Sequence, residues 1–107
     1  EVIMATTPEG VVKKKVVAIL KARKCYYFLP MTHGYGKSGV FDIVACYKGQ
    51  FIGIECKADA TKKMTALQVK NFNDANETGA TSLLIHKDNI NELESALKEI
   101  DFHASNP

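Results

Sequence analysis

The sequence predicts an α/β domain in which a mixed sheet of about four strands is flanked by helices. Two runs of β-branched and aromatic residues surround Gly49-Gln50, which is typical of a β-hairpin. Apolar residues recur at helical spacing in three other segments, one before the hairpin and two after it. At 107 residues, 46% of them hydrophobic, the chain has the size of one domain with a single core. The predicted order over residues 1–107 is helix, three strands, helix, strand, helix.

The first helix is predicted over residues 8–23. Thr7 suits the N-cap position and Pro8 suits the first turn. The apolar residues that repeat at helical spacing are Val12, Val16, Val17 and Leu20. Glu9 falls in the first turn, where its charge interacts favourably with the helix dipole, so helix stability alone is a sufficient reason for it.

The first strand is predicted at residues 25–29 and ends at Pro30. It carries three consecutive aromatic residues, which we expect to pack in the core rather than to form a stacking platform for RNA bases. These are Tyr26, Tyr27 and Phe28.

Residues 31–40 form a predicted loop with three glycines, which allow a ligand to approach the backbone closely. Three of its side chains suit contacts with phosphate, sugar or base: Tyr35, Lys37 and Ser38. Because the loop leads into a strand and not into a helix, it does not match a Walker nucleotide-binding loop.

The hairpin is predicted from strands at residues 42–47 and 51–56. A turn at Gly49-Gln50 places Asp42 opposite Lys57. Glu55 then lies diagonal to Asp42, and the alternation of side chains puts all three charges on one face of the sheet. Two interpretations stay open: a solvated cluster of ion pairs, or two carboxylates that share a hard cation such as Mg²⁺.

The remainder of the chain contributes two helices and a strand. After a polar connector at residues 58–63, Thr65 and Gln68 have the spacing of a capping box and begin a helix that ends near Gly79. A strand follows at residues 81–86. Asp88 or Asn89 is predicted to cap a last helix, and residues 101–107 are predicted to fray. The apolar positions of this helix are Ile90, Leu93, Leu97 and Ile100.

The net charge of +2 conceals an asymmetry. Up to Lys63, eleven Lys and Arg residues face five acidic residues, whereas three basic residues face seven acidic ones from Met64 onward. The basic part contains the candidate site, so a polyanion is a more suitable partner than a small neutral molecule. The run Lys13-Lys14-Lys15 also fits a merely solvated helix face.

Cysteine usage and hydropathy predict a cytoplasmic protein that does not bind membranes. The three cysteines form no Cys-x-x-Cys pair and suit small core residues in a reducing compartment. No apolar run approaches the length of a membrane helix, and the first residues show no signal-peptide pattern.

An ordered set of motifs resembles the PD-(D/E)xK nuclease superfamily, and most closely its VRR-NUC branch, the virus-type replication-repair nuclease domain. The resemblance covers about residues 7–98. The segments that carry it are Thr7-Pro8-Glu9-Gly10, the glycine-rich loop of residues 34–40, Asp42-Ile43, Gly53-Ile54-Glu55-Cys56-Lys57 and Thr65-Ala66-Leu67-Gln68. The family usually has proline before the aspartate, where this chain has Phe41.

The resemblance implies a PD-(D/E)xK nuclease-like core and a Mg²⁺- or Mn²⁺-dependent endonuclease that hydrolyses DNA phosphodiester bonds. In this family pattern Asp42 and Glu55 hold the metal, with the Cys56 carbonyl as a further ligand. Glu9 binds a second metal or orients a metal-bound water. Lys57 activates the attacking water and neutralises developing charge, and Gln68 supports Lys57.

The resemblance also implies a viral or bacterial protein that acts as a homodimer on branched DNA, including four-way (Holliday) junctions. The residues expected to contact DNA are Lys13, Tyr35, Lys37, Ser38, Lys62 and Lys63. Three alternatives stay open: a DNA-binding module without activity, a nuclease acting on RNA, and a nuclease acting on plain duplex or flap DNA.

Overall fold

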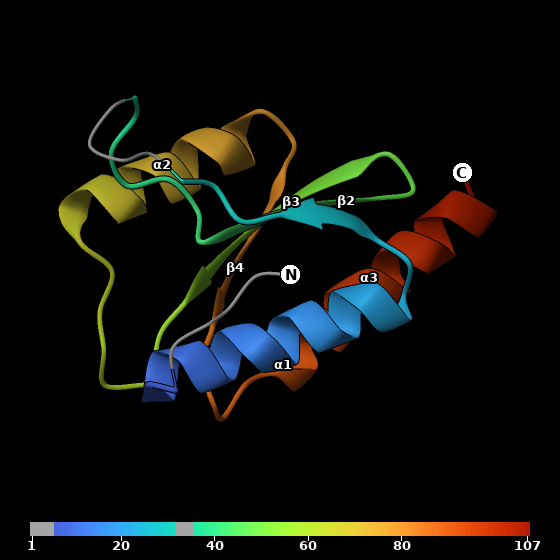
Figure 1. The fold of residues 1–107 in the computed structure, drawn as a ribbon. Coiled ribbons are helices and arrows are strands. Elements are labelled where there is room, and N and C mark those ends of the chain that lie inside the picture. Colours follow the sequence, from blue (N-terminus) through green and yellow to red (C-terminus); the bar gives the residue numbers. More distant parts are fainter. Residues whose placement is uncertain (1–5, 32–35) are drawn as a thin grey trace.

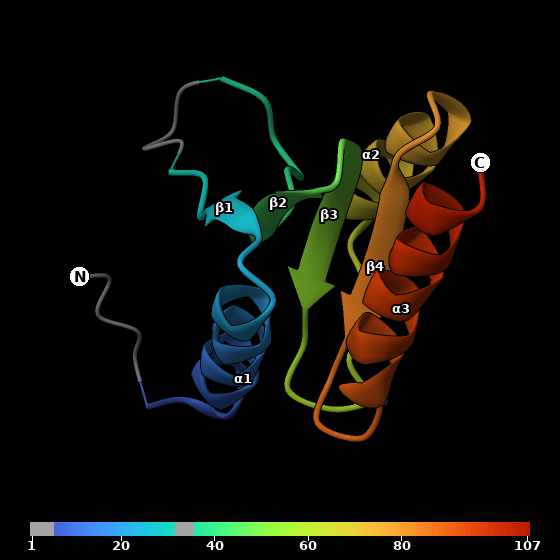
Figure 2. The same ribbon diagram turned by 90° about the vertical axis from the view of Figure 1, so that its right-hand side faces the viewer.

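The protein is a three-layered α/β domain built on a mixed four-stranded sheet, as the sequence predicted. The computed structural model describes residues 6–31 and 36–107. Helices α1 (Pro8–Ala22) and α3 (Asn91–Ser105) cover one face of the sheet, and α2 (Ala66–Glu77) lies on the other (Figures 1 and 2). The strands are β1 (Tyr26–Phe28), β2 (Ile43–Tyr47), β3 (Gln50–Cys56) and β4 (Thr81–Ile85).

The strand order is β1-β2-β3-β4. The first three strands are antiparallel neighbours, and β4 pairs in parallel with β3. A parallel pair needs a long crossover connection, and α2 supplies it. The predicted order of elements, αβββαβα, is therefore confirmed.

Helix α1 begins where the sequence predicts. The Thr7 hydroxyl accepts a hydrogen bond from the Gly10 backbone N–H at 3.0 Å, which satisfies one of the free donors of the first turn. The apolar positions of the helix are buried against the sheet, and they form one core with Leu93 and Leu97 of α3 and with alternate residues of β2 and β3.

Strand β1 corrects one expectation. Tyr27 packs against the core, but Tyr26 and Phe28 remain 71% and 47% exposed. The cause is the two-residue alternation in a strand, which directs these two side chains to the sheet face that carries α2. Helix α2 packs on β4, which is at the opposite edge of the sheet from β1, so the helix leaves these two side chains uncovered.

The hairpin turn also differs from the prediction. Its two central residues are Lys48 and Gly49, with φ angles of 49° and 83°, so Tyr47 pairs with Gln50. Two positive φ angles define a type I′ turn, which suits the twist of the flanking strands. The amide of Gln50 also donates to the Gly79 carbonyl at 2.8 Å, which holds this residue in the strand.

The observed turn shifts the register by two residues. Ile43 pairs with Ile54, so continuing the ladder by one step places Asp42 beside Glu55 and not opposite Lys57. Because a two-residue shift preserves the alternation, Asp42, Glu55 and Lys57 still share one face. The two carboxylates are therefore closer than the predicted diagonal arrangement allowed.

Two further predictions about α3 were wrong. Neither Asp88 nor Asn89 caps it, because Ile90 holds the N-cap position. The Asn89 side chain instead closes the preceding turn, accepting from the His86 N–H at 2.6 Å and donating to the Leu84 carbonyl at 2.8 Å. The helix also continues through Ser105 instead of fraying from Asp101, whose carboxylate pairs with Arg23 just after α1 and with Lys48 in the hairpin turn. None of the described helices has the length and apolar character needed to cross a bilayer.

Candidate active site

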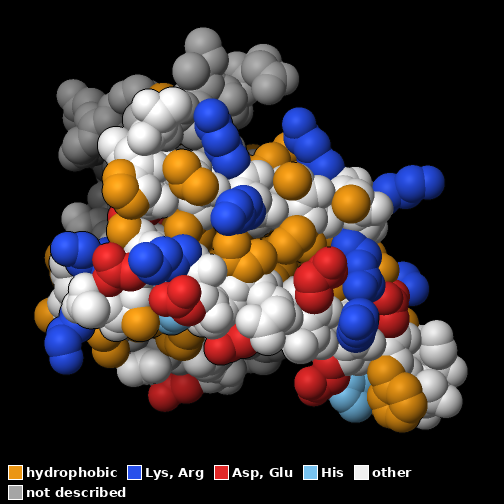
Figure 3. Space-filling model, turned by 90° about the horizontal axis from the view of Figure 1, so that it is seen from below, with side chains coloured by type: hydrophobic (Ala, Val, Ile, Leu, Met, Phe, Trp, Pro, Cys, Tyr) orange, Lys and Arg blue, Asp and Glu red, His pale blue; other side chains and the backbone are white. Residues whose placement is uncertain are grey.

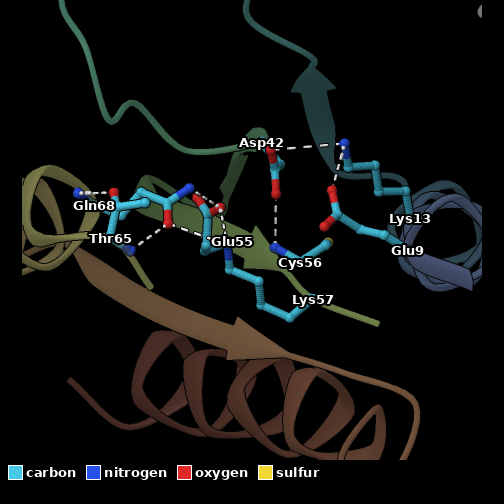
Figure 4. A network of polar contacts seen from close by, with 8 residues as sticks. All are labelled: Glu9, Lys13, Asp42, Glu55, Cys56, Lys57, Thr65 and Gln68. Carbon is cyan, nitrogen blue, oxygen red and sulfur yellow. Dashed lines mark hydrogen bonds and ion pairs between the residues drawn. The ribbon is translucent and has the colours of Figure 1, made fainter. Parts of the chain in front are cut away.

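The candidate site lies where β2 begins and β3 ends, on the face of the sheet that carries α2 (Figure 4). Asp42 immediately precedes β2, and Glu55 is the penultimate residue of β3. Lys57 follows that strand directly, and its backbone N–H donates to the Ile85 carbonyl at 2.9 Å, which continues the ladder with β4. Strand pairing thus fixes the positions of all three residues.

Glu55 is the one charged side chain that is buried among the described residues, with 3% of its surface exposed. Burial is the main reason that its pKa rises to about 8, and the neighbouring Asp42 charge raises it further. Lys57 counteracts this rise, but its ammonium lies 3.9 Å from the nearest Glu55 oxygen. The site therefore disfavours two negative charges until a cation approaches.

Gln68 connects this pair to helix α2. Its side-chain amide donates to Glu55 Oε2 at 2.6 Å, while its carbonyl oxygen accepts from Lys57 Nζ at 3.1 Å. The same oxygen accepts from the Thr65 backbone N–H at 2.9 Å, and the Gln68 N–H donates to the Thr65 hydroxyl at 3.2 Å. The predicted capping box is thus confirmed, and its glutamine also contacts the predicted catalytic lysine.

Asp42 is held from the other side. Its Oδ2 accepts a hydrogen bond from the Cys56 backbone N–H at 2.8 Å, and its Oδ1 lies 3.7 Å from Lys13 Nζ. Lys13 also pairs with Glu9 at 3.2 Å, so the lysine links the helical glutamate to Asp42. Partial burial works against the Lys13 charge, but the two carboxylates prevail and its pKa is raised.

Cys56 contributes its peptide, not its thiol, to this side of the site. Its side chain belongs to the core on the opposite face of the sheet, where burial raises the thiol pKa to about 12. The thiol is therefore on the opposite face of the sheet from the two carboxylates. The role predicted for its carbonyl oxygen stays a prediction.

The predicted DNA contacts lie in different surroundings. Lys37, Ser38, Lys62 and Lys63 are exposed, the first two before β2 and the others in the connector before α2. Lys13 faces Glu9 and Asp42, and these ion pairs account for it without a phosphate. Tyr35 lies outside the described residues.

Two features of the site were not predicted from the sequence. Lys13 was not recognised as a bridge, although Glu9 and Lys13 have the i, i+4 spacing at which helical side chains pair. The ring of Phe41 lies so close to Gly53 that a Cβ added there would be 2.3 Å from the nearest ring atom. Phe41 is therefore the residue that fixes the chain just before Asp42, and only glycine leaves it room.

The donor set suits a hard cation held by two protein carboxylates. Among residues 6–31 and 36–107 there is no group of three or more His, Cys, Asp and Glu side chains placed to hold a metal ion. Asp42 and Glu55 form a pair, and Mg²⁺ commonly binds one or two carboxylates while water and phosphate oxygens complete its shell. The raised pKa of Glu55 agrees with a pair that binds a cation.

No protein-family model matches the chain, and no curated protein or solved structure matches it either.

Proposed function

We propose that the protein is a Mg²⁺- or Mn²⁺-dependent endonuclease that hydrolyses DNA phosphodiester bonds, similar to VRR-NUC domains. The observation that carries this proposal is the buried Glu55 beside Asp42, with Lys57 held next to them by Gln68. The motif resemblance supports the same reaction.

The alternative interpretation, a structural cluster of ion pairs, accounts less well for Glu55. A carboxylate in a stabilising ion pair has a lowered pKa, because the opposite charge favours its ionised form. Glu55 shows the reverse, with a pKa of about 8. A charge placed where the fold disfavours it is typical of functional sites.

In this proposal Asp42 and Glu55 hold the metal ion, which when bound lowers the pKa of water and draws charge from phosphoryl oxygens. The Lys57 ammonium orients the attacking water and stabilises negative charge that develops on the phosphate. Gln68 restricts the position of Lys57 by accepting its hydrogen bond. Lys13 keeps Glu9 at the Asp42 side of the site, where the family pattern expects a helical glutamate.

The charge distribution supports a nucleic-acid substrate. Basic side chains are gathered along the α1 side of the molecule in the view from below (Figure 3). Branched DNA and a symmetric dimer with two active sites remain part of the proposal because of the family pattern. The exposed Tyr26 and Phe28 favour RNA as a second candidate substrate, since unpaired bases stack on such side chains.

A cleavage screen tests this function. The wild-type protein is incubated with duplex, flap, four-way junction and RNA substrates, with Mg²⁺ and with EDTA. We expect Mg²⁺-dependent cleavage that Asp42→Asn and Glu55→Gln each abolish. The asparagine keeps an acceptor for the Cys56 N–H, so loss of activity would not reflect an unpaired backbone group.

Asp88→Asn is the matched control, since it removes an exposed carboxylate on the turn between β4 and α3. Cleavage retained by Asp42→Asn, or no metal-dependent cleavage of any substrate by the wild type, would contradict the proposal. Light scattering that shows a monomer, together with equal cleavage of linear duplex and junction, would overturn only the dimer and branched-DNA parts.

A further inference from the structure

A groove of about 880 Å³ lies between α2 and the hairpin, next to the candidate active site. We call it the aromatic groove. Six of the residues that line it are Phe28, Lys37, Phe41, Val44, Phe51 and Asn71. A volume of this size with a mainly apolar lining is typical of sites for small or flat ligands.

Aromatic rings form the walls of the groove. Phe28 and Phe51 are 47% and 44% exposed, so both offer free ring surface. Phe41 lies between the hairpin and the helix, with its centroid 6.5 Å from that of Phe51 and 6.3 Å from that of Phe72. Tyr26 extends this surface beyond Phe28, at a centroid distance of 6.2 Å.

Asn71 supplies a polar group within these apolar walls. It is 9% exposed and is one of only two buried polar or charged residues among the described part of the chain. The other, Glu55, accepts a hydrogen bond from Gln68, whereas Asn71 lies on the wall of the groove. An asparagine side chain offers both donors and an acceptor, so a ligand with a donor and an acceptor on one edge suits this position.

The groove and the carboxylates share one face of the sheet. Phe28 pairs with Val44, and Val44 with Gly53, so these residues alternate in step with Glu55. Phe51 and Glu55 lie four residues apart on β3, which corresponds to about 13 Å along the strand. Phe41, in the groove wall, directly precedes Asp42.

We propose that the aromatic groove binds an unpaired nucleobase of the substrate strand, next to the phosphate that is cleaved. A base offers flat faces for stacking on Phe28 and Phe51 and a hydrogen-bonding edge for Asn71. Lys37 at the rim supplies a positive charge for the neighbouring phosphate, in part offset by Asp74. This inference rests on the proposed nuclease function and specifies that a stretch of the substrate is single-stranded.

The observations favour a base over a second copy of the chain. Exposed aromatic rings and an asparagine amide in one groove match the flat faces and the polar edge of a base. The groove also opens on the same face as Glu55 and Lys57, so a strand bound there is placed for cleavage.

Binding without cleavage tests the inference. A single strand of about 12 nucleotides carrying 2-aminopurine, and a duplex of equal length, are titrated with protein in Ca²⁺ in place of Mg²⁺. We expect 2-aminopurine fluorescence to be quenched on binding the wild type, as stacking requires. Phe28→Ala, Phe51→Ala and Asn71→Leu should weaken single-strand binding roughly 5- to 100-fold and leave duplex affinity within about 2-fold.

Phe102→Ala is the matched control, because Phe102 is an exposed aromatic residue (61%) on α3, which covers the other face of the sheet. Thermal unfolding of each variant separates loss of binding from loss of folding. Phe28 lies on an exposed edge strand, so Phe28→Ala remains informative if Phe51→Ala does not fold.

Unchanged single-strand affinity and quenching in all three folded variants would overturn the inference. So would conversion of a dimer to a monomer by these variants with base binding unaffected, since the groove would then be an interface between copies. Failure of the nuclease proposal is distinguishable: the wild type would cut nothing with Mg²⁺, while the groove variants would still lose single-strand binding.

Discussion

Gln68 is the residue whose side chain performs two tasks at once. It completes the capping box of α2 with Thr65, and it contacts both Glu55 and Lys57. The helix terminus therefore fixes the position of the candidate catalytic lysine. Stability and activity should separate when the two members of the capping box are changed individually.

Thr65→Ala and Gln68→Ala are a matched pair for this separation. Both remove a capping hydrogen bond, and each should lower the free energy of unfolding by about 1 kcal/mol. Only Gln68→Ala also releases Lys57, so it should reduce kcat about 10-fold or more while Thr65→Ala leaves kcat nearly unchanged. Urea unfolding and steady-state cleavage measure the two effects. Equal kcat values for the two variants would reduce Gln68 to a capping residue.

Lys57 should act mainly in the transition state. Lys57→Ala is expected to lower kcat by about 100-fold or more, whereas DNA affinity measured in Ca²⁺ should change by less than about 5-fold. Lys70→Ala, on the exposed surface of α2, is the control for general loss of positive charge. If affinity falls as much as the rate, Lys57 binds phosphate in the ground state and has no special role in the chemical step.

At the scale of elements, the hairpin shows what sequence patterns can determine. The alternation in β2 and β3 correctly predicted that Asp42, Glu55 and Lys57 share a face. A shift of the register by two residues does not change the face on which a side chain lies. The register depends on which two residues form the turn. Gly49 was expected first in the turn but takes the second place, with Lys48 before it in a left-handed conformation that few lysines adopt.

Contacts between elements were the least predictable part of the site. The Phe41 ring on Gly53 and the Lys13 bridge to Asp42 depend on how α1, the β2 start and β3 meet in space. The exposure of Tyr26 and Phe28 likewise depends on how far α2 extends across the sheet. Capping boxes and periodicity depend on local sequence only. They therefore predicted the bounds of α2 well, but not how much of the sheet this helix covers.

Gly53→Ala tests the contact between Phe41 and β3. The added methyl group would overlap the ring, so we expect a loss of about 1–3 kcal/mol in unfolding free energy and a displaced Asp42. Adding Phe41→Leu to Gly53→Ala should recover part of the lost unfolding free energy, because the smaller side chain makes room for the methyl group. A denaturation-based double-mutant cycle measures this coupling. Additive losses would show that the ring moves freely aside.

At the scale of the whole molecule, Asp101 of α3 connects that helix to the end of α1 and to the hairpin. Its carboxylate contacts Arg23 after α1 at 2.9 Å, Lys48 in the hairpin turn at 2.7 Å and the Tyr47 hydroxyl at 2.8 Å. The Lys48 contact is the largest cause of its lowered pKa, followed by the Tyr47 hydrogen bond. This cluster was not predicted, because its members come from three segments that lie far apart along the chain.

Removal of the Asp101 charge should lower the free energy of unfolding by an amount that depends on pH. Because the folded state lowers the Asp101 pKa, its contribution to stability is complete above the ordinary value of 3.8 and is lost as the pH falls below it. Asp101→Asn should therefore be less stable than wild type at pH 7, and the difference should shrink below about pH 4. Urea unfolding at both pH values measures this. A difference that is constant with pH would assign the effect to packing.

The single parallel pairing in the sheet has a consequence for the order of folding. Tyr47 pairs with Gln50 across a tight turn, whereas Ile52 pairs with Thr81, which lies beyond the whole α2 crossover. Local pairings close sooner than distant ones, so the hairpin should be part of the folding nucleus and α2 should dock late. Gly49→Ala should then slow refolding, while Thr65→Ala should mainly accelerate unfolding, as stopped-flow kinetics in urea would show. The two carboxylates would thus come together before Gln68 and Lys57 are in place, and the last step of folding would be the one that completes the site.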